Sequence, residues 1–174
     1  MKKIILVFGL ISGAISSTLM IATIPFADRM GHSLFVGYAT MVASFLLVYF
    51  GIRSYRDNVG AGSITFGKAF GIGICITLIS CAFYIVTWEI IYFNFMHDFL
   101  DKYNAHIIVK LQESGATAAF IQAKMQEMAA FKKSYENPFF NAAVTFVEPF
   151  PVGLLITLIS SAILRKKPQP APAP

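Results

Sequence analysis

Two glutamates stand in or beside long apolar stretches, where an ionisable side chain could carry chemistry. Glu148 lies in the segment TFVEPFPVGLLITLISSAIL, directly before Pro149 and three residues before Pro151. Glu89 follows the apolar run that ends at Trp88. An ionisable side chain at mid-membrane costs at least about 2.5 to 3.5 kcal/mol, so such a residue usually marks an ion pathway or a helix partner. We therefore treat Glu148 and Glu89, with the two prolines, as candidate residues for transport or helix pairing.

The surroundings of Glu148 allow more than one interpretation. In the first, a helix begins near Pro149, because a proline tolerates the first turn, and Glu148 lies near water at the positive end of the helix dipole. In the second, the helix extends further upstream and is interrupted inside the membrane. Pro149 and Pro151 would then leave the carbonyl groups of Thr145 and Val147 without helical donors, and a proton or cation could bind there. In a third, Glu148 simply pairs with another helix.

The depth of the two acids can be estimated from the nearest basic residues. At about 1.5 Å per residue, Glu89 lies roughly 31 Å along a helix counted from Lys68. Glu148 lies about 25 Å along a helix counted from Arg165. The hydrocarbon core is about 30 Å thick, so both acids are expected in its outer half or at its rim.

The elements that would position these residues are four apolar stretches. Of the 174 residues, 56% are hydrophobic and 13% are charged, whereas a soluble domain has about 25% charged residues. A membrane-spanning helix needs about 20 apolar residues. We expect an all-α four-helix transmembrane bundle in one domain, residues 1–167, with spans at residues 4–27, 33–52, 69–92 and 139–164.

The two ends of the chain have compositions of their own. The first apolar run is longer than the core of a signal peptide, about 7 to 15 residues, so we expect it to stay as an anchor. Residues 168–174 alternate proline with alanine or glutamine. Proline cannot support a helix ladder, so we expect a disordered tail there.

Basic residues predict how the chain is threaded. Eight of them flank apolar runs at what would be the same side of the membrane, with Asp57 as the only acid there: Lys2, Lys3, Arg53, Arg56, Lys68, Arg165, Lys166 and Lys167. Residues 98–137 hold five basic and five acidic residues. The positive-inside rule then places both termini in the cytoplasm, and we expect a multi-pass protein of the inner membrane. Arg53, Arg56 and Lys68 are candidate contacts for anionic lipid headgroups.

The polar segment at residues 97–137 is expected outside, as an amphipathic helix with a break near Gly115. Its apolar residues recur at helical spacings: Ile107, Leu111, Ala118, Ile121, Met125 and Met128. We interpret them as a packing stripe, with a ligand-binding lid as the alternative. Four residues near its start could in principle bind a metal: His97, Asp98, Asp101 and His106. Asp101 could share a helical face with His97, but His106 has no register to either, so we expect a solvated helix end and no metal site.

Small residues predict close helix packing. Gly9 and Gly13 form a GxxxG pattern in the first apolar run. A second face steps back from Glu89 through mostly small residues: Ala82, Leu78, Cys75 and Gly71. We expect Cys75 and Cys81 to be buried apolar residues. Between the second and third runs, a turn at residues 57–60 is expected, with Ser63 or Thr65 as the next helix cap.

No motif for catalysis or cofactor binding is present. The chain has no GxSxG, HExxH or CxxC pattern, and Lys68 is followed by Ala69 where a phosphate loop needs a hydroxyl group. No basic stripe interleaved with aromatic residues suggests a nucleic-acid partner. We therefore expect neither an enzyme nor a cofactor, and the partners we expect are membrane lipids and membrane proteins, including other copies of the chain.

Two stretches taken together resemble a known family. They are SYRDNVGAGSITFGKAFGIG, which enters the third apolar run, and EPFPVGLLITLISSAILRKK, which closes the fourth. Both are similar to bacterial membrane proteins grouped as the domain-of-unknown-function family 4199. The resemblance implies a four-helix integral membrane protein and no assigned reaction.

These observations favour a non-enzymatic accessory or scaffold protein that binds membrane partners, or itself, through faces of small residues. The alternative is a component of a proton- or cation-coupled transporter that uses Glu148 and Glu89. A lipid-modifying enzyme is a third class, which would need a polar pocket with a nucleophile and a base within reach of each other.

Overall fold

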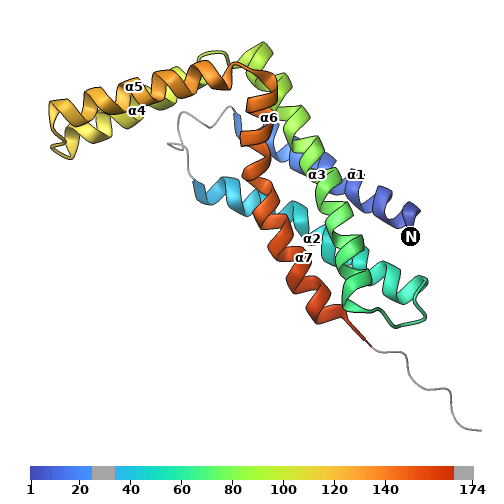
Figure 1. The fold of residues 1–174 in the computed structure, drawn as a ribbon. Coiled ribbons are helices and arrows are strands. Elements are labelled where there is room, and N and C mark those ends of the chain that lie inside the picture. Colours follow the sequence, from blue (N-terminus) through green and yellow to red (C-terminus); the bar gives the residue numbers. More distant parts are fainter. Residues whose placement is uncertain (25–33, 167–174) are drawn as a thin grey trace, which may run out of the picture. The chain divides into compact units, whose positions relative to one another are not determined.

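The computed structural model describes residues 1–24 and 34–166, and these residues are helical with short connections (Figure 1). The helices are α1 (Lys2–Thr23), α2 (Leu34–Asn58), α3 (Phe66–Phe95), α4 (Phe99–Glu113), α5 (Ala118–Tyr135), α6 (Pro138–Val147) and α7 (Pro149–Leu164). No β-strand occurs among these residues, so the predicted all-α class is confirmed. The predicted tail, Lys167 and the end of the first predicted span lie outside the described residues.

Three helices in the described part of the chain are long and apolar enough to cross a membrane. They are Lys2–Thr23, Phe66–Phe95 and Pro138–Leu164, the last of which joins α6 and α7. They correspond to three of the four predicted spans. The fourth prediction, residues 33–52, falls on α2, which is 25 residues long but is not among these helices. The final turns of α2 carry Arg53, Arg56 and Asp57, so a total of four spans stays a prediction.

The chain divides into two compact units. The first unit contains residues 1–85 and the residues from 146 onward, and the second contains residues 86–145. Helix α3 and the α6–α7 helix each contribute to both units. The two units are described separately below.

In the first unit, α1 approaches α3 at the predicted GxxxG pattern. A Cβ atom built on Gly9 would lie 2.9 Å from Cβ of Ile79, and one on Gly13 would lie 2.6 Å from Cγ of Phe83. Real Cβ atoms essentially never come this close to a neighbour, so the approach requires residues without side chains. Residue numbers rise together along the two helices, so α1 and α3 are parallel.

Helices α3 and α7 are held together by hydroxyl groups and glycines. Thr77 Oγ1 lies 3.0 Å from Thr157 Oγ1 and donates to the carbonyl oxygen of Gly153 at 3.4 Å. Both threonines are fully buried. A Cβ on Gly73 would lie 2.7 Å from Cγ2 of Thr157, and one on Gly153 would clash with Thr77. The pairs run in opposite order along the chain, so α3 and α7 are antiparallel.

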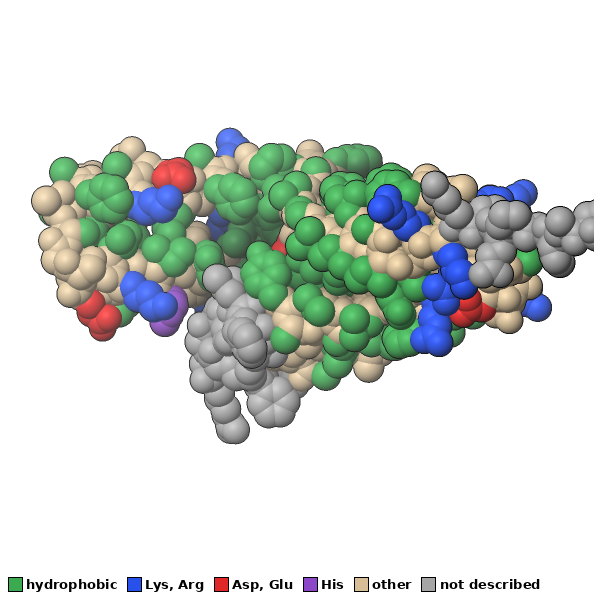
Figure 2. Space-filling model, turned by 90° about the horizontal axis from the view of Figure 1, so that it is seen from below, with side chains coloured by type: hydrophobic (Ala, Val, Ile, Leu, Met, Phe, Trp, Pro, Cys, Tyr) green, Lys and Arg blue, Asp and Glu red, His purple; other side chains and the backbone are tan. Residues whose placement is uncertain are grey.

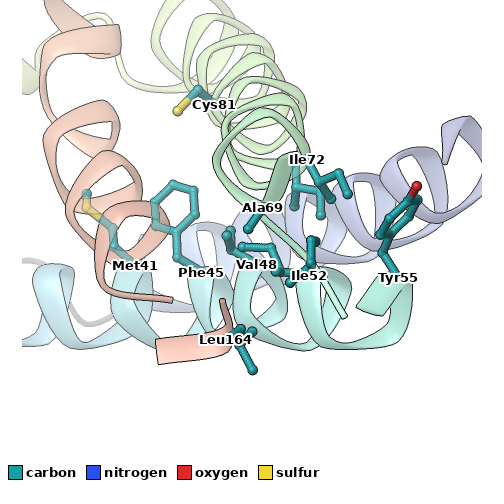
Figure 3. Packing of buried hydrophobic residues seen from close by; sticks show 11 residues of the cluster. Met41, Phe45, Val48, Ile52, Tyr55, Ala69, Ile72, Cys81 and Leu164 are labelled. Carbon is teal, nitrogen blue, oxygen red and sulfur yellow. The ribbon is translucent and has the colours of Figure 1, made fainter. Parts of the chain in front are cut away.

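The apolar core of the first unit lies against one face of α2. Met41, Phe45, Val48 and Ile52 follow each other at intervals of three or four residues, which places them on one side of the helix. They are buried together with residues of the neighbouring helices, including Ala69, Ile72 and Leu164 (Figure 3). A buried hydrogen bond from Ser12 Oγ to the carbonyl oxygen of Ser44, at 2.9 Å, joins α1 to α2.

The predicted packing face of α3 is not covered by the other described helices. Within this chain α3 packs through Gly73, Thr77 and Ser80, whereas the predicted face is exposed: Gly71, Cys75, Leu78 and Ala82. The predicted burial holds for Cys81, which is 1% exposed, and fails for Cys75. Small residues occur on more than one side of α3, and helical spacing alone does not show which side the other helices cover.

The connection between α2 and α3 is a tight turn that is hydrogen-bonded to the residues after the C-terminal end of α7. Ala61 and Gly62 have φ values of 48° and 78°. The hydroxyl group of Thr65 accepts from the backbone N–H of Lys68 at 3.4 Å, as expected for a helix cap. Ile64 and Lys166 form an isolated antiparallel bridge, with N–H to oxygen distances of 3.0 and 2.9 Å.

In the second unit, α4 and α5 form a helical hairpin, which Figure 1 shows side by side. The helix breaks at Gly115, whose φ of +76° suits glycine, so the predicted break is confirmed. Thr117 then caps α5 by accepting from the backbone N–H of Phe120 at 3.3 Å. The predicted packing stripe is only partly covered, because Met128 is buried whereas Met125 is 53% exposed.

A hydrogen-bond network links α3, α5 and α6 within the second unit. Trp88 Nε1 donates to the hydroxyl group of Tyr135 at 2.8 Å, and that hydroxyl lies 3.4 Å from Thr145 Oγ1. Thr145 Oγ1 donates to Asn141 Oδ1 at 3.1 Å, and Asn141 Nδ2 donates to the Tyr135 carbonyl oxygen at 3.4 Å. Tyr92, with ring centroid 5.1 Å from that of Tyr135, is buried beside the network.

We predict that Gly73→Leu destabilises the first unit and that Gly71→Leu does not. A side chain at position 73 must displace Thr157, and such overpacking costs about 1 to 3 kcal/mol. A Cβ at Gly71 meets nothing within 4 Å. Unfolding of both variants by titration with a denaturing detergent measures the difference, and equal midpoints for the two would contradict the α3–α7 packing.

We predict that Tyr135→Phe lowers the stability of the second unit by about 1 kcal/mol, the usual net contribution of a hydrogen bond. The variant keeps the ring but removes the partner of the Trp88 indole. Trp88 is the single tryptophan of the chain, so its fluorescence during denaturation reports on this unit. Tyr38→Phe, at an exposed position of α2 in the first unit, is the matched control and should leave the transition unchanged.

Candidate functional site

Glu148 stands at the junction of α6 and α7, inside a helix that continues on both sides of it. Its φ and ψ are −76° and −59°, which are helical values, and no side-chain capping bond is made. The candidate span runs from Pro138 to Leu164. Helix α7 begins at Pro149 with Glu148 as its N-cap residue, as the first interpretation expected, and α6 extends the helical backbone upstream to Pro138, as the second expected.

The two prolines interrupt the hydrogen bonding of this helix without ending it. Pro149 and Pro151 have no N–H group, so the carbonyl groups of Thr145 and Val147 receive no bond from the residue four positions later. Pro149 is fully buried, and the Phe146 and Phe150 rings stack with centroids 4.7 Å apart.

The Glu148 side chain is exposed at the surface of the first unit and is held by a tyrosine of α3. The hydroxyl group of Tyr84 donates to Glu148 Oε2 at 3.1 Å. A carboxyl group can accept several hydrogen bonds, so this pair leaves acceptor capacity open toward the surroundings of the unit. The pair can therefore bind a proton, a cation, or a donor from another helix.

Glu89 belongs to the second unit, so the structure does not bring it together with Glu148. Glu89 as a whole is partly exposed, but its Oε1 atom is buried and has no hydrogen-bond partner among the described residues. The neighbouring Trp88 donates to Tyr135, and Tyr92 packs inside the unit. These two aromatic residues take part in the core of the second unit.

The basic residues proposed to contact lipid headgroups lie around the α2–α3 turn. Arg56 Nε lies 2.7 Å from one oxygen of Asp57, and Arg53 Nε lies 3.5 Å from the other. The hydrogen bond from Arg56 lowers the pKa of the Asp57 carboxyl, with a smaller contribution from Arg53. Lys68 Nζ lies 5.6 Å from the centre of the Tyr55 ring. Two arginines share one acid here, which leaves a net positive charge.

The histidines and acids at the start of the polar segment do not gather. Asp98 pairs with Lys102 at 2.9 Å, and Asp101 pairs with Lys132 at 2.6 Å. Over the residues that the structure describes, no group of three or more His, Cys, Asp or Glu side chains could hold a metal ion.

Sequence reasoning missed Tyr84 and the network around Tyr135. Tyr84 is 64 residues from Glu148, and no local pattern links the two. Asn141 and Thr145 carry a usable signal, because a polar pair at a spacing of four in an apolar helix predicts a shared buried face. Their partner Tyr135 lies outside that helix and could not be inferred.

The comparisons with known proteins give a family and no activity. Residues 7–166 match the family model described as Protein of unknown function (DUF4199). No curated protein and no solved structure matches the chain. The matched region covers nearly the whole sequence and includes both candidate glutamates. The chain belongs to the DUF4199 family.

Proposed function

We propose that this chain is a multi-pass protein of the bacterial inner membrane, with α1, α2, α3 and the α6–α7 helix as four spans and both termini cytoplasmic. The helix pairing of the first unit supports this orientation. Because α1 is parallel to α3, and α3 is antiparallel to α7, the basic residues at the start of α1, the end of α2, the start of α3 and the end of α7 belong to one end of the unit. Figure 2 shows Lys and Arg side chains gathered at the right of the view, beside a broad apolar surface. A basic end facing the cytoplasm agrees with the positive-inside rule.

Its role in this proposal is that of a non-enzymatic accessory protein that binds another membrane helix, from a second copy or a different protein. The observation that carries the proposal is the open face of α3. Gly71 has nothing within 4 Å of an added Cβ, Cys75 is exposed, and Leu78 is 44% exposed. In a membrane, helices associate by close van der Waals packing at small residues, so this face suits a partner helix.

The rest of the first unit supports the same role. At the glycines of its internal contacts, such as Gly13 and Gly73, side chains of neighbouring helices occupy the space beside the Cα atom. The open face repeats this kind of surface, and none of the described residues covers it at Gly71. A partner helix there would make the contact that α1 and α7 already make on other sides of α3.

A crosslinking experiment at Cys75 tests this proposal. With Cys81 replaced by serine, a benzophenone maleimide on Cys75 should give a discrete protein adduct in liposomes if the partner is a second copy, or in native membranes if it is another protein. Gly71→Leu should reduce the adduct several-fold, because the added side chain blocks close approach. A label on Leu10→Cys, an exposed position of α1, is the control. Equal labelling of lipid alone from both positions would contradict partner binding.

The alternative function is transport of protons or cations, which the geometry at Glu148 supports. A carboxyl group beside two prolines that interrupt a spanning helix is an arrangement found in transport sites. If Glu148 carries protons or cations, Glu148→Gln should abolish flux in proteoliposomes and Tyr84→Phe should reduce it. Glu113→Gln, at an exposed residue of α4, is the control. Flux equal to that of the unmodified protein, or no flux in either, would remove transport from consideration.

A further inference from the structure

A groove runs between α4 and α5, entirely within the second unit. Its volume is about 720 Å³, within the range of small-molecule sites. We call it the α4–α5 groove, and its lining residues differ in polarity along its length. Its apolar part contains Ile108, Val109, Met125, Met128 and Ala129.

The apolar part of the groove is only partly covered by the described residues. Val109 is 49% exposed and Met125 is 53% exposed, although they line the same groove as the buried Met128. Methionine side chains are flexible and polarisable, so they adapt to the shape of an apolar ligand. This part of the groove therefore suits a hydrocarbon chain.

The other end of the groove carries four charges. Asp101 and Lys132 are paired, with Lys132 Nζ 2.6 and 2.7 Å from the two carboxylate oxygens. Lys133 and Glu136 line the same end, and no ion pair is described for either of them. The four charges sum to zero. What this end offers a ligand is one cation and one anion, which is the complement of a zwitterion.

The charged end is also the end of the hairpin nearest to the candidate spanning helices along the chain. Asp101 follows the end of α3 at Phe95 by six residues, and Glu136 precedes the start of the last candidate span at Pro138 by two. From there the lining proceeds along both helices, through Met128, toward the turn at Gly115. This inference rests on the membrane orientation proposed above: with the candidate spans across a bilayer, the charged end of the groove belongs at the level of the lipid headgroups.

We propose that the α4–α5 groove binds one acyl chain of an ethanolamine phospholipid. The acyl chain occupies the apolar part, the phosphate accepts from Lys133, and the ammonium group donates to Glu136. A partner helix is the other occupant that an apolar groove can take, but it would not explain why the charges gather at one end. This binding is independent of the partner helix at the open face of α3, since that face belongs to the first unit.

Photolabelling of the full-length protein in liposomes tests the proposal. The probes are phospholipids with a diazirine on one acyl chain and either an ethanolamine or a glycerol headgroup, at equal mole fraction. We expect peptides that contain Met125 and Met128 to be labelled several-fold more by the ethanolamine probe. Glu136→Gln should remove this preference, because it removes the anion that selects the ammonium group.

Two tryptophan variants separate groove binding from general contact with the bilayer. Ala129→Trp fills the groove and should reduce labelling of the Met125 and Met128 peptides several-fold, while labelling of the spanning helices stays unchanged. Ala130→Trp adds the same bulk at a neighbouring position that does not line the groove, and should have no effect. Helix content by circular dichroism checks that both variants fold, and Glu136→Gln tests the headgroup without added bulk.

The proposal is overturned by any of three results. Equal labelling by both probes in the unmodified protein would show that no headgroup is selected. Labelling that Ala129→Trp leaves unchanged would place the probe outside the groove. A crosslink from the groove to a protein in place of lipid would show that a helix occupies it. None of these results bears on crosslinking at Cys75, so the two proposals fail separately.

Discussion

The first unit depends on how closely α3 approaches α7. Thr77 and Thr157 share a buried hydrogen bond, and Gly73 and Gly153 provide the space for it. In lipid there is no hydrophobic force that drives one apolar helix against another, so contact has to come from close packing and from polar groups that find partners. A larger residue at either glycine would separate the helices and leave the hydroxyl groups without partners in an apolar medium.

The second unit is organised on a different principle. Its core combines aromatic rings with a chain of hydrogen bonds from Trp88 through Tyr135 to Thr145 and Asn141. Each buried polar side chain of this hydrogen-bond network has a partner, which is necessary because a buried polar group without a hydrogen bond costs free energy. The hairpin of α4 and α5 extends beyond this core. There, among the described residues, the apolar side of each helix is covered only by the other helix of the hairpin. Its methionines therefore remain accessible, and this produces the α4–α5 groove.

Much of the fold could be predicted from the sequence, because long apolar runs have few structural solutions in a membrane. Helices α1 and α3, the α6–α7 helix, the break at Gly115 and the contact at Gly9 and Gly13 all follow from composition and spacing. For α2 the run of apolar residues predicts a helix correctly. Its last turns carry charged residues, and α2 is not among the helices that length and composition identify as candidate spans.

The parts that could not be predicted depend on contacts between distant residues. The face of α3 through Gly71 and Cys75 has the same kind of spacing as the face that is packed, and only the positions of α1 and α7 distinguish them. Tyr84 meets Glu148 because α3 and α7 are antiparallel, which no local pattern records. Glu148 itself was recognised because an acid in an apolar run is rare, but its place on the outside of the first unit depends on which way the helix is turned.

The bridge between Ile64 and Lys166 has a consequence for biosynthesis. Ribosomes make the chain from the N-terminus, so Ile64 leaves the ribosome about a hundred residues before its partner. During that interval the turn before α3 lacks its two backbone hydrogen bonds to Lys166. The last residues of α7 then close this turn by two backbone hydrogen bonds. The turn at the basic end of the first unit can thus close only after Lys166 has been synthesised.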